Sequence, residues 1–100
     1  MWSENEEAIG STGSENGIII LDLEHSEGAR ISLEEKSTVA PFSITIGIYG
    51  LLMHTIFCSD KIEADEKISL IKQLIEKAIK YCQKDAKTEL YSLLDQIALL

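Results

Sequence analysis

The feature that most constrains this chain is a run of 23 residues, Ser37 to Ser59, that contains no Asp, Glu, Lys or Arg. A run of this length could span a bilayer as a helix. However, it holds one proline, two glycines and many β-branched residues, and its first half alternates polar and apolar residues, which is typical of strands. We therefore expect two strands, over 42–48 and 51–58, joined by a tight reversal, and no membrane association.

The flanking sequence predicts two further strands and two helices. Residues 17–24 and 29–34 alternate with a period of two around a turn at 25–28, which is typical of a hairpin. Apolar residues then recur every three or four positions over 60–82, and again over about 86–99. The predicted fold class is α+β: a four-stranded antiparallel sheet, a long helix packed on one face, and a shorter C-terminal helix.

The first 16 residues are expected to be a disordered acidic tail, and residues 17–100 a single domain. The tail carries four acidic residues and no basic one, and it is rich in Gly and Ser. Such a composition buries too little apolar surface to order itself. The alternative is a tail that folds on a partner.

The net charge of −8 excludes some classes of partner. An acidic surface repels nucleic acid and anionic lipid, so neither is expected to bind. The two cysteines, Cys58 and Cys82, would lie about 35 Å apart along a helix over 60–82, too far for a disulfide. Free thiols and an acidic N-terminus without a signal-peptide pattern predict a cytoplasmic protein.

The residues that could carry chemistry are few. The candidate metal ligands His25, His54, Cys58 and Cys82 have none of the usual ligand spacings, so neither a metal nor a cofactor is expected. No nucleophile elbow or phosphate-binding loop is present, and the sequence favours a protein that is not an enzyme.

One polar cluster could nevertheless bind a ligand. The predicted strand pairing brings four residues together on neighbouring strands: Arg30, Thr45, Tyr49 and His54. The alternative for the only arginine is an ion pair across the hairpin with Asp22 or Glu24.

The predicted fourth strand is apolar on both faces, which is typical of a strand covered on both sides. We expect its Leu52 and Ile56 to lie on the sheet face away from the long helix. Together with Leu94 and Ile97 of the apolar C-terminus, they predict a homodimer interface. The alternative is a monomer that folds its last helix back over its own sheet.

Residues 28–34 and 41–55 resemble a group of small bacterial proteins that have no assigned activity. The shared features are an A-R-I-T-L-E-like strand, here Ala29 to Glu34, and a G-[IV]-Y-G-x-[ML]-x-H-T-like hairpin, here Gly47 to Thr55. The resemblance covers roughly residues 17–82. It implies a fold and no function.

These observations predict a small non-enzymatic binding or assembly protein that acts as a homodimer. One alternative is an acidic inhibitor of a basic protein partner, of the immunity-protein or antitoxin kind, because complementary charge speeds association. Another is a small-ligand site or enzyme centred on His54 and Tyr49.

Overall fold

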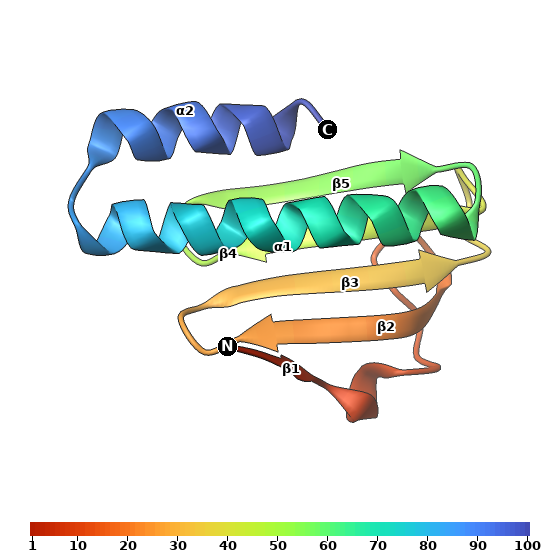
Figure 1. Cartoon of the computed structure of the whole chain (residues 1–100). Helices are drawn as coiled ribbons and strands as arrows, with labels where there is room; N and C mark the ends of the chain where they lie inside the picture. Colours follow the sequence, from red (N-terminus) through yellow and green to blue (C-terminus); the bar gives the residue numbers. More distant parts are fainter.

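Five antiparallel strands lie side by side in chain order, and two helices cover one face of the sheet they form (Figure 1). The computed structural model describes all 100 residues. The strands are β1 (Trp2–Glu4), β2 (Ile18–His25), β3 (Ala29–Glu35), β4 (Phe42–Ile48) and β5 (Leu52–Cys58); the helices are α1 (Lys61–Gln83) and α2 (Lys87–Ala98), and a single 3₁₀ turn, η1, spans Glu6–Ala8.

The antiparallel α+β architecture is confirmed, but the predicted count of four strands is wrong. The fifth strand, β1, lies within the segment that was expected to be a disordered tail, and it pairs with the end of β2. The following loop is also bonded to β2: the amide of Gly10 donates to the carbonyl of Ile19 at 2.8 Å, and the amide of Ile19 donates to Ser11 at 2.9 Å. Backbone hydrogen bonds of this kind leave no trace in hydrophobic periodicity.

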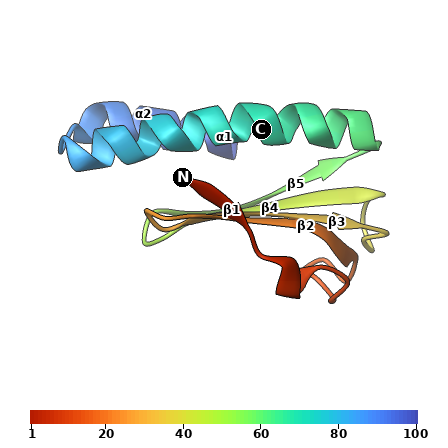
Figure 2. The same cartoon turned by 60° about the horizontal axis from the view of Figure 1, so that its bottom comes forward.

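Helix α1 begins and packs as its sequence predicts. The side chain of Asp60 accepts a hydrogen bond from the amide of Glu63 at 2.8 Å and so caps the helix. Its apolar stripe is buried against the sheet up to Ala78. Cys82, which was predicted to extend the stripe, is exposed because the end of α1 projects beyond the sheet (Figures 1 and 2).

Both helices lie on the same side of the sheet (Figure 2). Helix α2 packs along α1 on the β5 side, where it buries Leu90, Leu93, Leu94 and Ile97. The predicted alternative, in which the last helix crosses the opposite face, is not the one observed. The opposite face, which we call the open face, therefore has no helix over it. None of the helices is both long enough and apolar enough to cross a membrane.

Register decides which residues reach each face. Ile44 pairs with Ile56, and Ile48 with Leu52, so all four point toward the helices. The expectation that Leu52 and Ile56 occupy the face away from the long helix is wrong. Both faces of β5 are apolar, so its sequence alone gives no sign of its orientation; the short turn after Ile48 sets it.

The N-terminal segment covers the β2–β3 half of the open face. Glu34 points to this face and is almost fully buried. Its carboxylate accepts hydrogen bonds from the amides of Gly17 at 2.9 Å and Glu15 at 3.2 Å. Ser14 also reaches Thr45 of β4, with 3.2 Å between the two hydroxyl oxygens. The β4–β5 half of the open face stays uncovered beyond this point.

Candidate functional site

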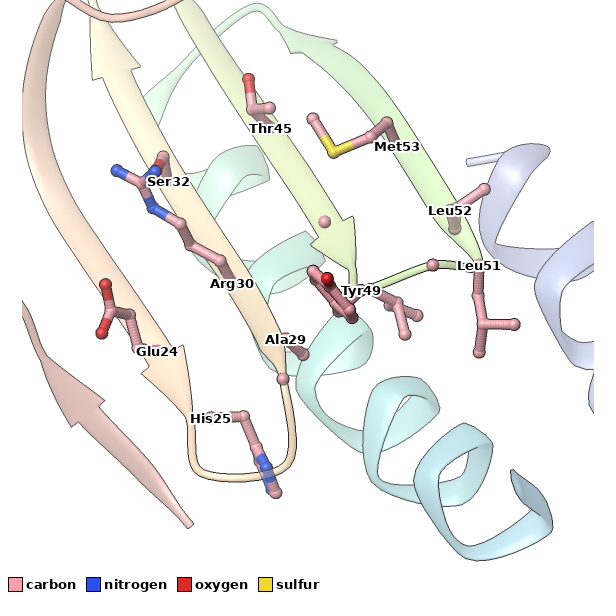
Figure 3. A pocket seen from close by; sticks show the side chains of 14 residues that line it. Glu24, His25, Ala29, Arg30, Ser32, Thr45, Tyr49, Leu51, Leu52 and Met53 are labelled. Carbon is pink, nitrogen blue, oxygen red and sulfur yellow. The ribbon is translucent and has the colours of Figure 1, made fainter. Parts of the chain in front are cut away.

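A groove of about 630 Å³ lies on the open face, at the end where the β2–β3 and β4–β5 turns meet. Figure 3 shows its floor, formed by β3 and β4, and its rims, formed by side chains of β2 and β5. The two turns are tied together, because the amide of Tyr49 donates to the carbonyl of Gly28 at 2.8 Å. The groove is lined by Glu24, His25, Gly28, Ala29, Arg30, Ser32, Thr45, Gly47, Ile48, Tyr49, Gly50, Leu51, Leu52 and Met53.

Three of the four residues predicted to bind a ligand line this groove: Arg30, Thr45 and Tyr49. The fourth, His54, does not. It pairs with Ile46, whose side chain is fully buried on the helix-covered face. Neighbouring residues of a strand point to opposite faces, so the residue of β5 that reaches the groove is Met53. The sheet therefore does not assemble a site centred on His54.

Arg30 makes the cross-hairpin pair that its position predicted. Its Nε donates to Oδ1 of Asp22 at 3.0 Å, and its Nη2 makes a second short contact with Oδ2. These hydrogen bonds raise the pKa of the guanidinium above its ordinary value, although partial burial opposes the change. Asp22 is fully buried. The positive charge of Arg30 therefore compensates the buried Asp22 carboxylate, which requires such a partner.

Glu24 is the one carboxylate of the groove that has no ion pair. It lies on β2 directly opposite Arg30, but the fork of Arg30 is taken by Asp22. Glu24 accepts one long hydrogen bond, from the side-chain Nδ2 of Asn5 at 3.5 Å. Because the Arg30–Asp22 pair is neutral as a unit, the groove carries net negative charge from Glu24.

His25 lines the groove but is not free to bind a ligand there. Its Nδ1 accepts a hydrogen bond from the amide of Glu27 at 3.0 Å. Its Nε2 lies 2.6 Å from a carboxylate oxygen of Glu76 on α1 and 2.9 Å from the amino group of Met1. The ring therefore ties the end of β2 to the helix layer, and Figure 3 shows it turned away from the other labelled side chains.

An apolar rim runs along the β5 side of the groove. The sulfur of Met53 lies over Gly47, at 3.1 Å from the position that a Cβ atom there would occupy. Tyr49 stands at the end of β4 and is 90% exposed, and Met53 is 76% exposed. Farther along β5 on the same face, Phe57 is 44% exposed. We call Tyr49, Met53 and Phe57 the apolar strip.

The four residues predicted to form a dimer interface lie inside the monomer. Ile56, Leu94 and Ile97 belong to the buried core, and Leu52 packs against that core. They have little surface to offer a second chain. The apolar C-terminus is mostly satisfied by packing within the chain, whereas the apolar strip stays uncovered on the sheet.

Sequence reasoning missed Met53 and Phe57 as surface residues. It also left open whether Arg30 pairs with Asp22 or with Glu24. The signal for Met53 was its position opposite Gly47 across the three-residue turn 49–51, which fixes both on the same face. No three His, Cys, Asp or Glu residues lie close enough to hold a metal ion. The groove offers the hydroxyls of Ser32, Thr45 and Tyr49 and the carboxylate of Glu24, a set suited to binding donor-rich or cationic groups.

Comparison with protein families, with curated proteins and with solved structures finds no match for this chain. The resemblance of the Gly47–Thr55 hairpin to small bacterial proteins therefore stays a prediction.

Proposed function

We propose that this protein is a non-enzymatic binding protein that acts as a homodimer, and that it associates through the β4–β5 half of its open face. The observation that carries the proposal is the apolar strip, which lies on that half with no helix and no loop over it. Large apolar side chains gathered on one uncovered face of a sheet mark a candidate interaction surface.

Burial of the apolar strip supplies the driving force. A large apolar side chain gains about 1.5–3 kcal/mol when it moves from water into a packed interface. Met53 and Phe57 are exposed, and they point to the same face as Thr55 because each lies two positions from it along β5. In a two-fold dimer each residue is counted twice, so even partial burial of the strip favours association.

The charge distribution also favours this half of the molecule. Two chains of net charge −8 repel each other. However, β4, β5 and the turn between them lie within the charge-free run 37–59. A contact made there places no carboxylate against another, whereas a contact through α1 or the N-terminal segment would.

The test is the molar mass in solution, measured by size-exclusion chromatography with light scattering over a concentration series. The proposal predicts a mass approaching twice the 11.1 kDa of one chain at micromolar concentration and above. A mass of one chain throughout the series would refute it. Ile62, 72% exposed on α1, provides a matched control: Ile62→Lys should leave the mass unchanged.

A second candidate function is the inhibition of a basic protein partner, favoured by the unpaired carboxylate of Glu24 in the groove. A lysine side chain could place its stem along Tyr49 and Met53 and its ammonium group at Glu24. An oligolysine peptide is the probe. Glu24→Gln should weaken its binding more than Glu66→Gln, a matched change on the exposed side of α1; equal effects would show that only net charge matters.

A further inference from the structure

Strand β5 is an open edge of the sheet. It pairs with β4 on one side and with no strand on the other. Outside the β4 pairing, no hydrogen bond within the chain involves a backbone group of residues 52–58. Alternate amides and carbonyls along the outer side of β5 therefore lack a partner in the protein.

This edge lacks the charges, prolines and bulges that usually protect an edge strand. It is seven residues long and keeps an unbroken register with β4, so no bulge twists it away. It contains no charged residue and no proline. The opposite edge, β1, is only three residues long. Proteins whose edges stay free normally interrupt them with a charge, a proline or a bulge.

We propose that β5 of a second copy of this chain completes this edge, antiparallel and about a two-fold axis at Thr55, so that the two sheets become continuous. The inference rests on the homodimer proposed above and assigns its interface. Self-pairing of Thr55 is the register in which all seven residues of both strands overlap. It is also the arrangement that a two-fold axis produces, since the same surface serves both subunits.

This register gives the two residues of the apolar strip that lie on β5, Met53 and Phe57, new neighbours across the seam. Residues equally spaced on either side of Thr55 face each other, so Met53 lies opposite Phe57 of the partner subunit, and the pair occurs twice. A thioether against an aromatic ring is a favourable contact, and directly opposed side chains are the main stabilising pairs of a sheet. The two Thr55 side chains meet at the axis, where their hydroxyls can bond.

The position of α2 agrees with an extended sheet. Helix α2 lies beside α1 on the β5 side, so the helix layer reaches past the last strand (Figure 1). Strands added at this edge would lie under that overhang. In each subunit the two strands closest to the seam, β4 and β5, lie within the charge-free run 37–59. The charged residues behind the net charge of −8 therefore lie outside these strands.

A charge-swap experiment tests the register. Met53→Lys and Phe57→Glu each place a charge against an apolar residue, and each should raise the dimer dissociation constant about tenfold. The double variant Met53→Lys/Phe57→Glu places Lys against Glu at both ends of the seam and should recover affinity to within about threefold of the native chain. Within one chain the two positions are about 13 Å apart along the strand, so they cannot pair with each other.

The outcomes separate this inference from the proposed function. A native chain that stays monomeric refutes both. If the native chain is a dimer and the single variants do not weaken it, the β5 seam is refuted and the homodimer stands. The same holds if both single variants weaken the dimer and the double variant does not recover its affinity. Met53→Glu/Phe57→Glu is the matched control and should stay monomeric, because like charges then face each other. Circular dichroism of each variant verifies the fold.

Discussion

Gly13 and Glu34 lie in direct contact: a Cβ atom at residue 13 would lie 2.2 Å from Cδ of Glu34. Glu34 is on β3, and Gly13 precedes β2, so the contact holds the N-terminal loop to the open face. The buried carboxylate accepts amide hydrogen bonds from that loop. A buried charge needs such donors, because leaving it without them is costly.

Gly13→Ala is expected to push the loop off Glu34 and to lower the free energy of unfolding by about 1–3 kcal/mol, the cost of a buried group that loses its hydrogen bonds. Denaturant unfolding measures this loss. Hydrogen exchange should also speed up at the amides of Gly17 and Ile19, which in the native chain are bonded to Glu34 and to Ser11 of the loop. A variant with native stability and native protection at these amides would contradict the role given to the contact.

Arg30→Ala is expected to lower the free energy of unfolding by about 2–3 kcal/mol, because it leaves the buried Asp22 carboxylate without its partner. The half-exposed position of the Arg30 side chain keeps the value below that of a fully buried pair. Arg30→Lys should restore part of the loss, since lysine keeps the charge but not the two-pronged geometry. If thermal unfolding finds Arg30→Ala no worse than Lys77→Ala on the exposed side of α1, the pair is not stabilising.

Asp60→Ala is expected to destabilise the protein by about 1 kcal/mol, because the side chain caps α1 at the amide of Glu63. Asp60→Asn should retain most of the stability, since asparagine caps helices about as well. Chemical denaturation of the three proteins gives the comparison. Equal losses for Ala and Asn would point to the charge of Asp60 rather than to its hydrogen bond.

How far the sequence predicts this fold depends on whether a residue's role shows in a periodic pattern. The alternation of β3 and β4 predicted which of their side chains face the helices, and the stripe of α1 was predicted correctly from Ala64 to Ala78 but not at Cys82, because each element has one apolar side. The orientation of β5 could not be predicted, because Leu52 and Met53 are both apolar and only the pairing of Ile48 with Leu52 decides between them.

The N-terminal segment shows the other limit of sequence reasoning. Its order comes from backbone bonds to Ile19 and from amides that reach Glu34, which involve no apolar periodicity. A register shift between Ile19 and Leu21 also turns Ile19 to the open face, under this segment, whereas strict alternation placed it with Leu21 and Leu23. For the candidate site, the sequence predicted Arg30, Thr45 and Tyr49 correctly as groove residues. It also predicted His54, whereas its neighbour Met53 is the residue that reaches the groove.

The two thiols are expected to differ in reactivity. Cys82 is exposed and Cys58 is buried. Burial, assisted by Glu63, raises the pKa of the Cys58 thiol, so little reactive thiolate forms at neutral pH. An aromatic disulfide reagent should label one thiol per native chain quickly and both in denaturant, and Cys82→Ser should remove the fast reaction. Rapid labelling of Cys58 in that variant would contradict its place in the core.

The raised pKa of Cys58 also predicts an alkaline loss of stability. The unfolded thiol ionises near its ordinary pKa of 9.0, whereas the folded thiol ionises at higher pH. The contribution of Cys58 to stability is therefore complete below that value and is lost as the pH rises through the folded pKa. Cys58→Ala should unfold with a weaker dependence on pH above 9.0, measured by denaturation from neutral to alkaline pH.

Amide hydrogen exchange along β5, measured well above and well below the concentration at which the dimer dissociates, tests the account most directly. If two copies join at this edge, every amide from Leu52 to Cys58 exchanges slowly in the concentrated sample, and alternate amides become fast on dilution. Alternate amides that exchange rapidly at every concentration would show that the edge stays open and that the seam at Thr55 does not form.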